Sequence, residues 1–336
     1  MKSNSFTRSE NAFSLPTRLR RNRRTPAIRR MVQETELNAA DLVAPLFLVE
    51  GHHIAEPIHS MPGICRYSLD LAFSKIERWH ERGVQSVALF PAIDSSLRNP
   101  TGDEASNPDG LIPRAIRSIK ERFPTLCIIS DVALDPYTSH GHDGIVNERG
   151  EIVNDATIEH LIQMALVQAE AGVDFIAPSD MMDGRVKALR TALDEHQFEQ
   201  TGILAYSAKY ASALYGPFRD ALQVNLQFGD KKTYQMDPAN GREALLEARL
   251  DEQEGADILM VKPALFYLDI ISKLRQQTHL PIAAYHVSGE YAMVMAAAAA
   301  GYLDANKVFH EALLSIKRAG ADLIFTYAID ALLDRM

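Results

Sequence analysis

Short apolar runs alternate with amphipathic stretches from residue 41 onward. Most of these runs lack an alternation of apolar and polar residues, which is typical of parallel strands that are covered on both faces. They occupy 42–49, 84–90, 126–130, 173–178, 203–207, 257–261, 281–287 and 322–327. Helical patterns separate them, and four of these patterns close at a glycine just before the next strand, namely Gly83, Gly172, Gly255 and Gly320. Eight β/α units of this kind predict an α/β protein with a (β/α)8 TIM barrel. An open doubly wound sheet is the alternative, but no G-x-G-x-x-G motif follows any of the runs.

The composition agrees with one large globular body. With 336 residues, 46% hydrophobic and 24% charged, the chain can bury a sizeable core. No apolar stretch approaches the ~18 residues that span a bilayer, and the N-terminus lacks the apolar segment of a secretory signal. We therefore expect a cytoplasmic protein that does not enter a membrane. Its two cysteines, Cys65 and Cys127, are too few for a disulfide framework or a thiolate zinc site.

Charge divides the chain into an arm and a body. Residues 1–30 contain eight arginines and one lysine against one glutamate, a net charge of +8, so a total of −9 leaves −17 for residues 31–336. We interpret 1–30 as a basic arm that contacts an acidic surface of a neighbouring subunit, or as a solvated tail, and 31–336 as the catalytic barrel. An acidic body repels phosphate, so we expect no nucleic-acid partner.

Two lysines follow apolar strands directly. Lys209 lies in YSAKYAS and Lys262 in DILMVKP. In a barrel of this kind the chemistry collects at the carboxyl ends of the strands. The strands that carry these lysines are consecutive and should pair about 4.8 Å apart, so repulsion between the two amines should lower at least one pKa. A partly deprotonated amine can form an imine with a carbonyl compound, and two such amines indicate two carbonyl substrates.

The segment from 210 to about 240 is long for a connection between a strand and a helix, and such loops are often lids. Its cationic residues Arg219, Lys231 and Lys232, together with Gln235, could close over a substrate carboxylate while Phe218 excludes water. The alternative is an ordinary charged surface loop.

These residues resemble the porphobilinogen synthase family, also called 5-aminolevulinate dehydratase, whose members join two aminolevulinate molecules in tetrapyrrole biosynthesis. The resemblance covers nearly the whole chain, from the arginine-rich arm to KRAGAD. It is carried by MPG, GDEASNPDG, DVALDPYTSHGHDG, APSDMMDGR, YSAKYAS, YGPFRDA, YQMDPAN, MVKP, YLDI and VSGEYAM.

The resemblance implies roles for the residues at the strand ends. Lys262 would form an imine with the molecule that supplies the propionate side of the product, and Lys209 with the one that supplies the acetate side. Ser288 and Tyr327 would bind the first carboxylate. Arg219, Lys231 and Gln235 would bind the second. Our candidates for proton transfer are Asp131 and Asp135.

The expected metals differ from those of the zinc-dependent relatives. Those relatives carry cysteines where this chain has Ala133, Asp135 and Asp143, so no active-site zinc is expected. The two carboxylates favour magnesium, a monovalent cation or no ion, with Asp143 the candidate ligand. The neighbouring His140 and His142 are expected to anchor the loop by hydrogen bonds rather than to bind zinc.

The resemblance also implies an allosteric magnesium and an oligomer. Glu243 matches the glutamate that holds a stimulatory magnesium in relatives, with Asp180 nearby through water and Arg185 in the same region between subunits. The implied assembly is a homo-octamer. Two other functions remain open at this stage: an aldolase that uses one lysine on the same barrel, and a non-enzymatic barrel whose basic arm binds RNA.

Overall fold

The computed structural model describes residues 15–333, and the chain divides into two units, Met1–Glu36 and Leu37–Met336. Residues 1–14 of the predicted arm and 334–336 of the predicted barrel domain lie outside the described residues. The first unit contains η1 (Leu19–Arg23) and α1 (Pro26–Met31). Thr25 begins α1, because its hydroxyl accepts a hydrogen bond from the Ile28 N–H at 3.2 Å and Pro26 occupies the first turn.

The second unit is a closed barrel. Within the described residues, its eight parallel strands are β1 (Leu42–Val49), β4 (Ser86–Ala92), β5 (Cys127–Val132), β6 (Phe175–Pro178), β7 (Gly202–Lys209), β8 (Ile258–Lys262), β9 (Ile282–His286) and β10 (Leu323–Thr326). Pairing of Leu42 in β1 with Ile324 in β10 closes the circle. The predicted TIM barrel is therefore confirmed, and the predicted strands differ from the observed ones by at most two residues at either end.

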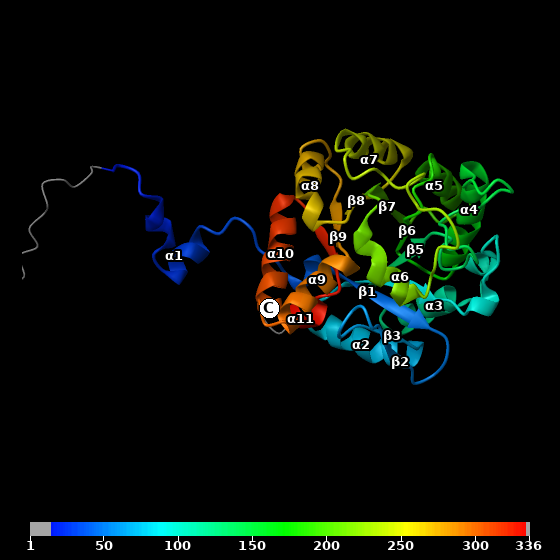
Figure 1. The fold of residues 1–336 in the computed structure, drawn as a ribbon, viewed down its shortest axis with the longest axis horizontal. Coiled ribbons are helices and arrows are strands. Elements are labelled where there is room, and N and C mark those ends of the chain that lie inside the picture. The colour runs from blue at the N-terminus through cyan, green and yellow to red at the C-terminus, as the bar shows by residue number, and fades with distance from the viewer. Residues whose placement is uncertain (1–14, 334–336) are drawn as a thin grey trace, which may run out of the picture. The chain divides into compact units, whose positions relative to one another are not determined.

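Helices surround the strands (Figure 1). They are α2 (Leu69–Glu81), α3 (Leu111–Arg122), α4 (Asn154–Glu170), α5 (Arg185–Glu195), α6 (Gly216–Leu222), α7 (Arg242–Glu254), α8 (Leu268–Arg275), α9 (Ser288–Ala299), α10 (Ala305–Ala319) and α11 (Ile329–Leu333). Short 3-10 turns occur at η2 (Ala39–Asp41), η3 (Ser95–Leu97), η4 (Asp103–Ser106), η5 (Ala213–Tyr215) and η6 (Leu265–Tyr267). None of the helices in residues 15–333 is both long and apolar enough to span a membrane.

Helix amphipathicity explains the layers. On α3, for example, Ile112, Ile116 and Ile119 are buried against the barrel, whereas Arg122 is exposed near the helix end. Gly255 ends α7 with φ +104°, a left-handed conformation that disfavours residues with a Cβ atom, and β8 begins three residues later. The short connection delivers the chain to the amino end of β8, so Lys262 emerges at the opposite end.

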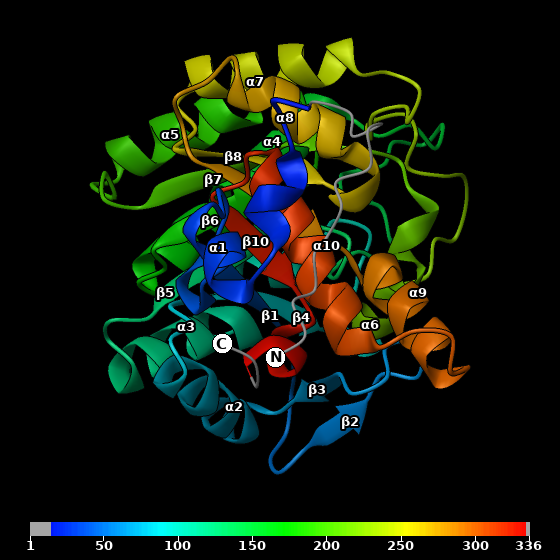
Figure 2. The ribbon, with the colours of Figure 1, turned by 90° about the vertical axis from the view of Figure 1, so that its left-hand side faces the viewer.

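An antiparallel hairpin, which the sequence analysis did not predict, follows β1. It consists of β2 (Ala55–Pro57) and β3 (Cys65–Tyr67), and Figure 2 shows it beyond the barrel, beside α2. Arg66 of β3 is buried and donates hydrogen bonds of 2.6 Å to the carbonyls of Asp220 and Ala221, at the end of α6. The hairpin therefore supports the helix that lies within the predicted lid.

Candidate active site

Lys209 and Lys262 lie side by side at the carboxyl ends of β7 and β8. They are register partners in the sheet, and each is only 6% exposed. Between Ala205 and Ala208 strand β7 advances three residues while β8 advances two, which is a bulge. The extra residue lets Tyr206 and Lys209 approach each other although an odd number of positions separates them. Lys209 Nζ lies 5.9 Å from the Tyr206 ring.

Aromatic rings enclose the amine of Lys262. Its Nζ lies 4.6 to 5.2 Å from four ring centres, those of Tyr206, Tyr215, Phe218 and Tyr285. Within the described part of the chain, its Nζ forms no ion pair with a carboxylate. Burial and then the charge of Lys209 lower the pKa of Lys262 to about 7. This lysine can therefore be a neutral nucleophile near neutral pH.

Lys209 has polar neighbours instead. Its Nζ donates a hydrogen bond to the carbonyl of Ser179 and lies 3.5 Å from Asp143 Oδ2. Ser179 directly follows β6, so the loop after that strand holds the amine. The two adjacent lysines thus have distinct electrostatic surroundings, one aromatic and one carboxylate.

Three carboxylates on and after β5 complete this polar side. Burial and the charge of Asp135 raise the pKa of Asp131 to about 7, while burial and Asp143 raise the pKa of Asp135. Burial alone would raise the pKa of Asp143 as well, but Lys209 and Lys231 lower it to about 2. Of the three, Asp143 is therefore the carboxylate whose charged form is most favoured.

Lys231 of the lid segment bridges two of these carboxylates. Its Nζ lies 2.6 Å from Asp143 Oδ1 and 3.1 Å from Asp135 Oδ2. Burial opposes its charge, but the two aspartates raise the pKa of Lys231 well above the ordinary value for lysine. The ammonium occupies the space between the carboxylates that the sequence analysis considered for an ion, so a divalent cation does not fit there in this arrangement.

The three residues predicted to bind the second carboxylate come together. Arg219, Lys231 and Gln235 line a pocket of about 420 Å³, and so does Lys232. Within residues 15–333, neither the Arg219 guanidinium nor the Gln235 side-chain amide has a hydrogen-bond partner. Donors without partners in a pocket are suited to an anionic ligand.

The residues predicted to bind the first carboxylate adjoin the Lys262 rings. Ser288 Oγ accepts a hydrogen bond from the Phe218 N–H at 3.0 Å and donates to the Leu214 carbonyl at 3.2 Å. The hydroxyl of Tyr327 is hydrogen-bonded to that of Tyr285 at 2.9 Å. The rings of Phe218 and Tyr285 both contact the amine of Lys262. Each predicted residue is therefore hydrogen-bonded to a residue that contacts this amine.

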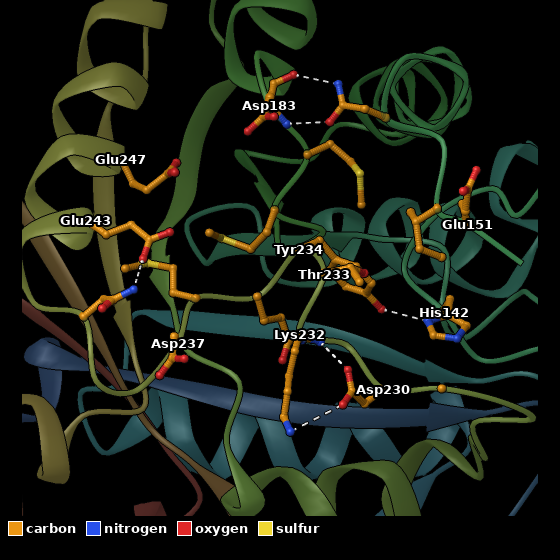
Figure 3. Close-up of a pocket in the computed structure, with 18 of the residues that line it drawn as sticks. His142, Glu151, Asp183, Asp230, Lys232, Thr233, Tyr234, Asp237, Glu243 and Glu247 are labelled. Carbon is orange, nitrogen blue, oxygen red and sulfur yellow. Dashed lines mark hydrogen bonds and ion pairs between the residues drawn. The ribbon is translucent and has the colours of Figure 1, made fainter.

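Glu243 lies on an acidic pocket of about 800 Å³ (Figure 3). The carboxylates that line this pocket are Glu151, Asp183, Asp230, Asp237, Glu243 and Glu247. Asp180, its predicted companion, is fully buried and does not line the pocket. Asp180 Oδ1 accepts a hydrogen bond from the Met182 N–H at 2.7 Å, and Arg185 Nε lies 3.6 Å from its Oδ2. The structure therefore does not bring the two predicted magnesium residues together directly.

Both histidines of the loop after β5 are loop anchors, as expected. His140 is hydrogen-bonded to the carbonyl of Pro100 at 3.1 Å, and His142 to the carbonyl of Phe228 at 3.1 Å and the hydroxyl of Tyr234 at 3.2 Å. Burial lowers the pKa of each imidazole. His142 therefore ties the loop after β5 to the lid segment.

Sequence analysis did not identify the aromatic surroundings of Lys262. Tyr206 and Tyr285 lie inside the apolar runs 203–207 and 281–287, where they look like ordinary core residues. A signal was present, because a tyrosine hydroxyl inside a fully buried strand needs a partner. That signal does not say which polar group the hydroxyl or ring meets, because the neighbours lie on other strands and in the lid segment.

The fold and the site define a class: a (β/α)8-barrel enzyme with two adjacent buried lysines at the carboxyl ends of its strands. A family model described as delta-aminolevulinic acid dehydratase matches residues 16–335. The chain therefore belongs to the delta-aminolevulinic acid dehydratase family and is an enzyme of this type.

Individual relatives agree over most of the chain. The chloroplastic delta-aminolevulinic acid dehydratase of Physcomitrium patens is 58% identical over 314 residues, 93% of this chain and 72% of the relative. The delta-aminolevulinic acid dehydratase of Chlamydia pneumoniae is 52% identical over 323 residues, 96% of this chain and 97% of the relative. The Toxoplasma gondii enzyme, solved with its reaction product porphobilinogen, superimposes with a TM-score of 0.94 at 49% identity, covering 96% of this chain and 92% of that one.

Proposed function

We propose that this protein condenses two molecules of 5-aminolevulinate to porphobilinogen with release of two waters, through imines on Lys209 and Lys262. The observation that carries this proposal is the pairing of two buried lysines as register neighbours on β7 and β8. An aldolase with one imine-forming lysine would leave the second buried amine without a role. The acidic body and the buried lysines likewise disfavour the RNA-binding alternative.

Lys262 starts the reaction as a neutral amine. Because its pKa is about 7, a large fraction is unprotonated near neutral pH. Its attack on the ketone carbon of the first substrate, followed by loss of the ketone oxygen as water, yields an imine. The surrounding rings exclude water, which protects that imine from hydrolysis.

Lys209 forms the second imine in the same way, with loss of the second water. This imine makes the adjacent carbon of its substrate acidic, because the imine nitrogen accepts the electron pair of the carbanion. The carbanion attacks the imine carbon on Lys262, and the amino group of the Lys262-bound molecule attacks the imine carbon on Lys209. Departure of both lysine amines and loss of protons then completes the pyrrole ring.

Asp131 and Asp135 are the proposed proton carriers. A carboxyl with a pKa of about 7, such as Asp131, can both accept and return a proton near neutral pH. Asp143 remains an anion and balances the charge of Lys209.

The two substrate carboxylates are held separately. We assign Ser288 and Tyr327 to the molecule on Lys262, because both adjoin its aromatic surroundings. Arg219, Lys231 and Gln235 are assigned to the molecule on Lys209, because they share one pocket. Fixing both molecules makes the two bond-forming steps intramolecular in effect.

Magnesium and the assembly complete the proposal. Carboxylate oxygens are the ligands that magnesium prefers, so the acidic pocket at Glu243 suits this ion with several of its waters retained. When bound, it would neutralise those carboxylates away from the reacting amines. Asp180 could contribute only through water or after rearrangement, because Arg185 and Met182 engage it. We further propose a homo-octamer, a cytoplasmic location and no active-site zinc.

The lysines are tested by replacing each with methionine. Lys209→Met and Lys262→Met should each reduce porphobilinogen formation by at least about 10³-fold, because each removes a nucleophile that no neighbour replaces. The matched control is Lys273→Met, an exposed lysine on α8 that should keep full activity. Retention of substantial turnover by either catalytic variant would favour a mechanism with a single imine.

A further inference from the structure

A group of metal-binding side chains lies outside the active site. His52 and His53 belong to the loop between β1 and β2, and Asp70 lies in the first turn of α2. Their nearest ligand atoms all fall within 4.8 Å of one another, and residues 15–333 contain no other group of three histidine, cysteine or acidic side chains that does so.

The distances within this group match a metal coordination shell. Asp70 Oδ2 lies 3.1 Å from His53 Nδ1 and 3.8 Å from His52 Nε2. Zinc bonds to nitrogen and oxygen are about 2.0 to 2.2 Å long, so two ligand atoms of a tetrahedral zinc are separated by about 3.3 Å. The observed separations lie on either side of that value, and small rotations of exposed side chains would equalise them.

The group is held in place before any ion binds. The Ile54 N–H donates a hydrogen bond to Ser68 Oγ at 2.8 Å, and the Ser68 N–H donates to the Ile54 carbonyl at 2.9 Å. The His53 N–H donates to Asp70 Oδ2 at 3.0 Å. Both imidazoles remain accessible, with side-chain exposures of 72% for His52 and 74% for His53.

We propose that His52, His53 and Asp70 form a surface site for one divalent transition metal, with zinc the best match. Two imidazoles and one carboxylate are a common protein ligand set for zinc, and water would fill the remaining position. Magnesium is a poor alternative, because it prefers an all-oxygen shell. The site is distinct from the lysine pair and takes no part in the proposed reaction.

The location gives the ion a structural effect. The site joins the loop after β1 to α2. The segment between these two elements, residues 50–68, also contains the hairpin that supports α6. Ser60, which follows the hairpin's first strand, donates a hydrogen bond of 2.5 Å to Asp220 on α6. A bound ion would therefore stabilise the segment 50–68 and raise the melting temperature of the protein.

The test is calorimetric titration of zinc chloride into untagged, full-length protein that has been treated with EDTA and desalted. His52→Ala and His53→Ala should each weaken the binding of one equivalent of zinc by at least about tenfold. The control is His59→Ala, which replaces an exposed histidine of the segment 50–68. This variant should bind zinc as tightly as the unaltered protein. Cobalt in place of zinc should give visible absorption bands, and His52→Ala and His53→Ala should each lose them.

Two results would overturn the site. One is the absence of zinc binding by the unaltered protein at a metal concentration of about 10⁻⁴ M, which is in the range of the dissociation constants of weak protein metal sites. The other is unchanged zinc affinity in a variant that lacks both His52 and His53. Melting curves recorded without metal show whether each variant is folded, and turnover assays report on the lysine mechanism independently.

Discussion

Two lysines of identical chemistry have different surroundings at the ends of β7 and β8. Lys262 is enclosed by aromatic rings, whereas Lys209 contacts the Ser179 carbonyl and the Asp143 carboxylate. Burial without a carboxylate partner favours the neutral form of an amine, and a nearby carboxylate favours the charged form. The first amine to attack a substrate should therefore be that of Lys262.

The pH dependence of turnover follows from this assignment. Because the neutral amine attacks and the pKa of Lys262 is about 7, kcat/KM should rise with pH and level off above that value. At one pH unit below the pKa, about a tenth of the amine is neutral, so the rate should be about tenfold below the plateau. The measurement is kcat/KM between about pH 5.5 and 8.5. A profile that is flat or falls through this range would contradict the assignment.

At the scale of elements, the predicted lid segment, residues 210 to about 240, contacts both lysine surroundings. Phe218 of α6 contacts Lys262, and Lys231 further along the segment bridges Asp135 and Asp143. Both lysines are only 6% exposed, so we predict that this segment moves to admit substrates. The ion pairs of Lys231 fasten the segment to the loop after β5 in this structure, and the same ammonium is proposed to bind a substrate carboxylate.

Removing the Lys231 charge should destabilise the protein. Lys231→Met removes the cation between the buried Asp135 and Asp143 and leaves Asp143 with Lys209 alone at 3.5 Å, which should lower the free energy of unfolding by about 3 kcal/mol. The measurement is urea denaturation at one fixed protein concentration. The matched control, Lys232→Met, removes the adjacent exposed lysine and should change the free energy of unfolding by less than about 0.5 kcal/mol. Equal stability of the two variants would show that the ion pairs do not hold the segment.

At the scale of the whole molecule, the barrel was predictable because the same pattern, a buried strand followed by an amphipathic helix, recurs eight times. Eight buried strands without alternation, separated by amphipathic helices, leave few folds open. The juxtaposition of Lys209 and Lys262 followed from the consecutive order of their strands. The cationic residues of the long loop indicated a carboxylate site, the family resemblance assigned Arg219, Lys231 and Gln235 to the second substrate, and the structure brings these three together.

Other features depend on tertiary contacts that a single sequence does not encode locally. The strands of the hairpin after β1 have three residues each, too few to show a periodicity. The bulge in β7 changes which side chains share a face, so the approach of Tyr206 to Lys209 was missed. The bridge joins Lys231 to Asp135, 96 residues away in sequence, and to Asp143, 88 residues away. No sequence pattern connects such distant residues.

The proposed magnesium effect is also a property of the whole molecule. If magnesium binds at Glu243 and favours the octamer, adding it to EDTA-treated protein should raise both the specific activity and the mass measured by sedimentation. Glu243→Gln should lose most of this response, because the amide cannot supply the anionic oxygen that magnesium prefers. Glu252→Gln, on the same helix but outside the acidic pocket, is the control and should respond normally. A Glu243→Gln variant with a full response would exclude this residue as the ligand, and activity restored only by zinc would contradict the metal assignment.

The central claim is that both lysines form imines, and reductive trapping tests it most directly. Protein incubated with isotopically labelled 5-aminolevulinate is treated with borohydride, which converts an imine to a stable secondary amine, and is then digested for peptide mass spectrometry. The account predicts labelled adducts on the peptides that contain Lys262 and Lys209, with Lys262 still labelled in Lys209→Met. Label confined to one lysine at saturating substrate, or found on neither, would contradict it.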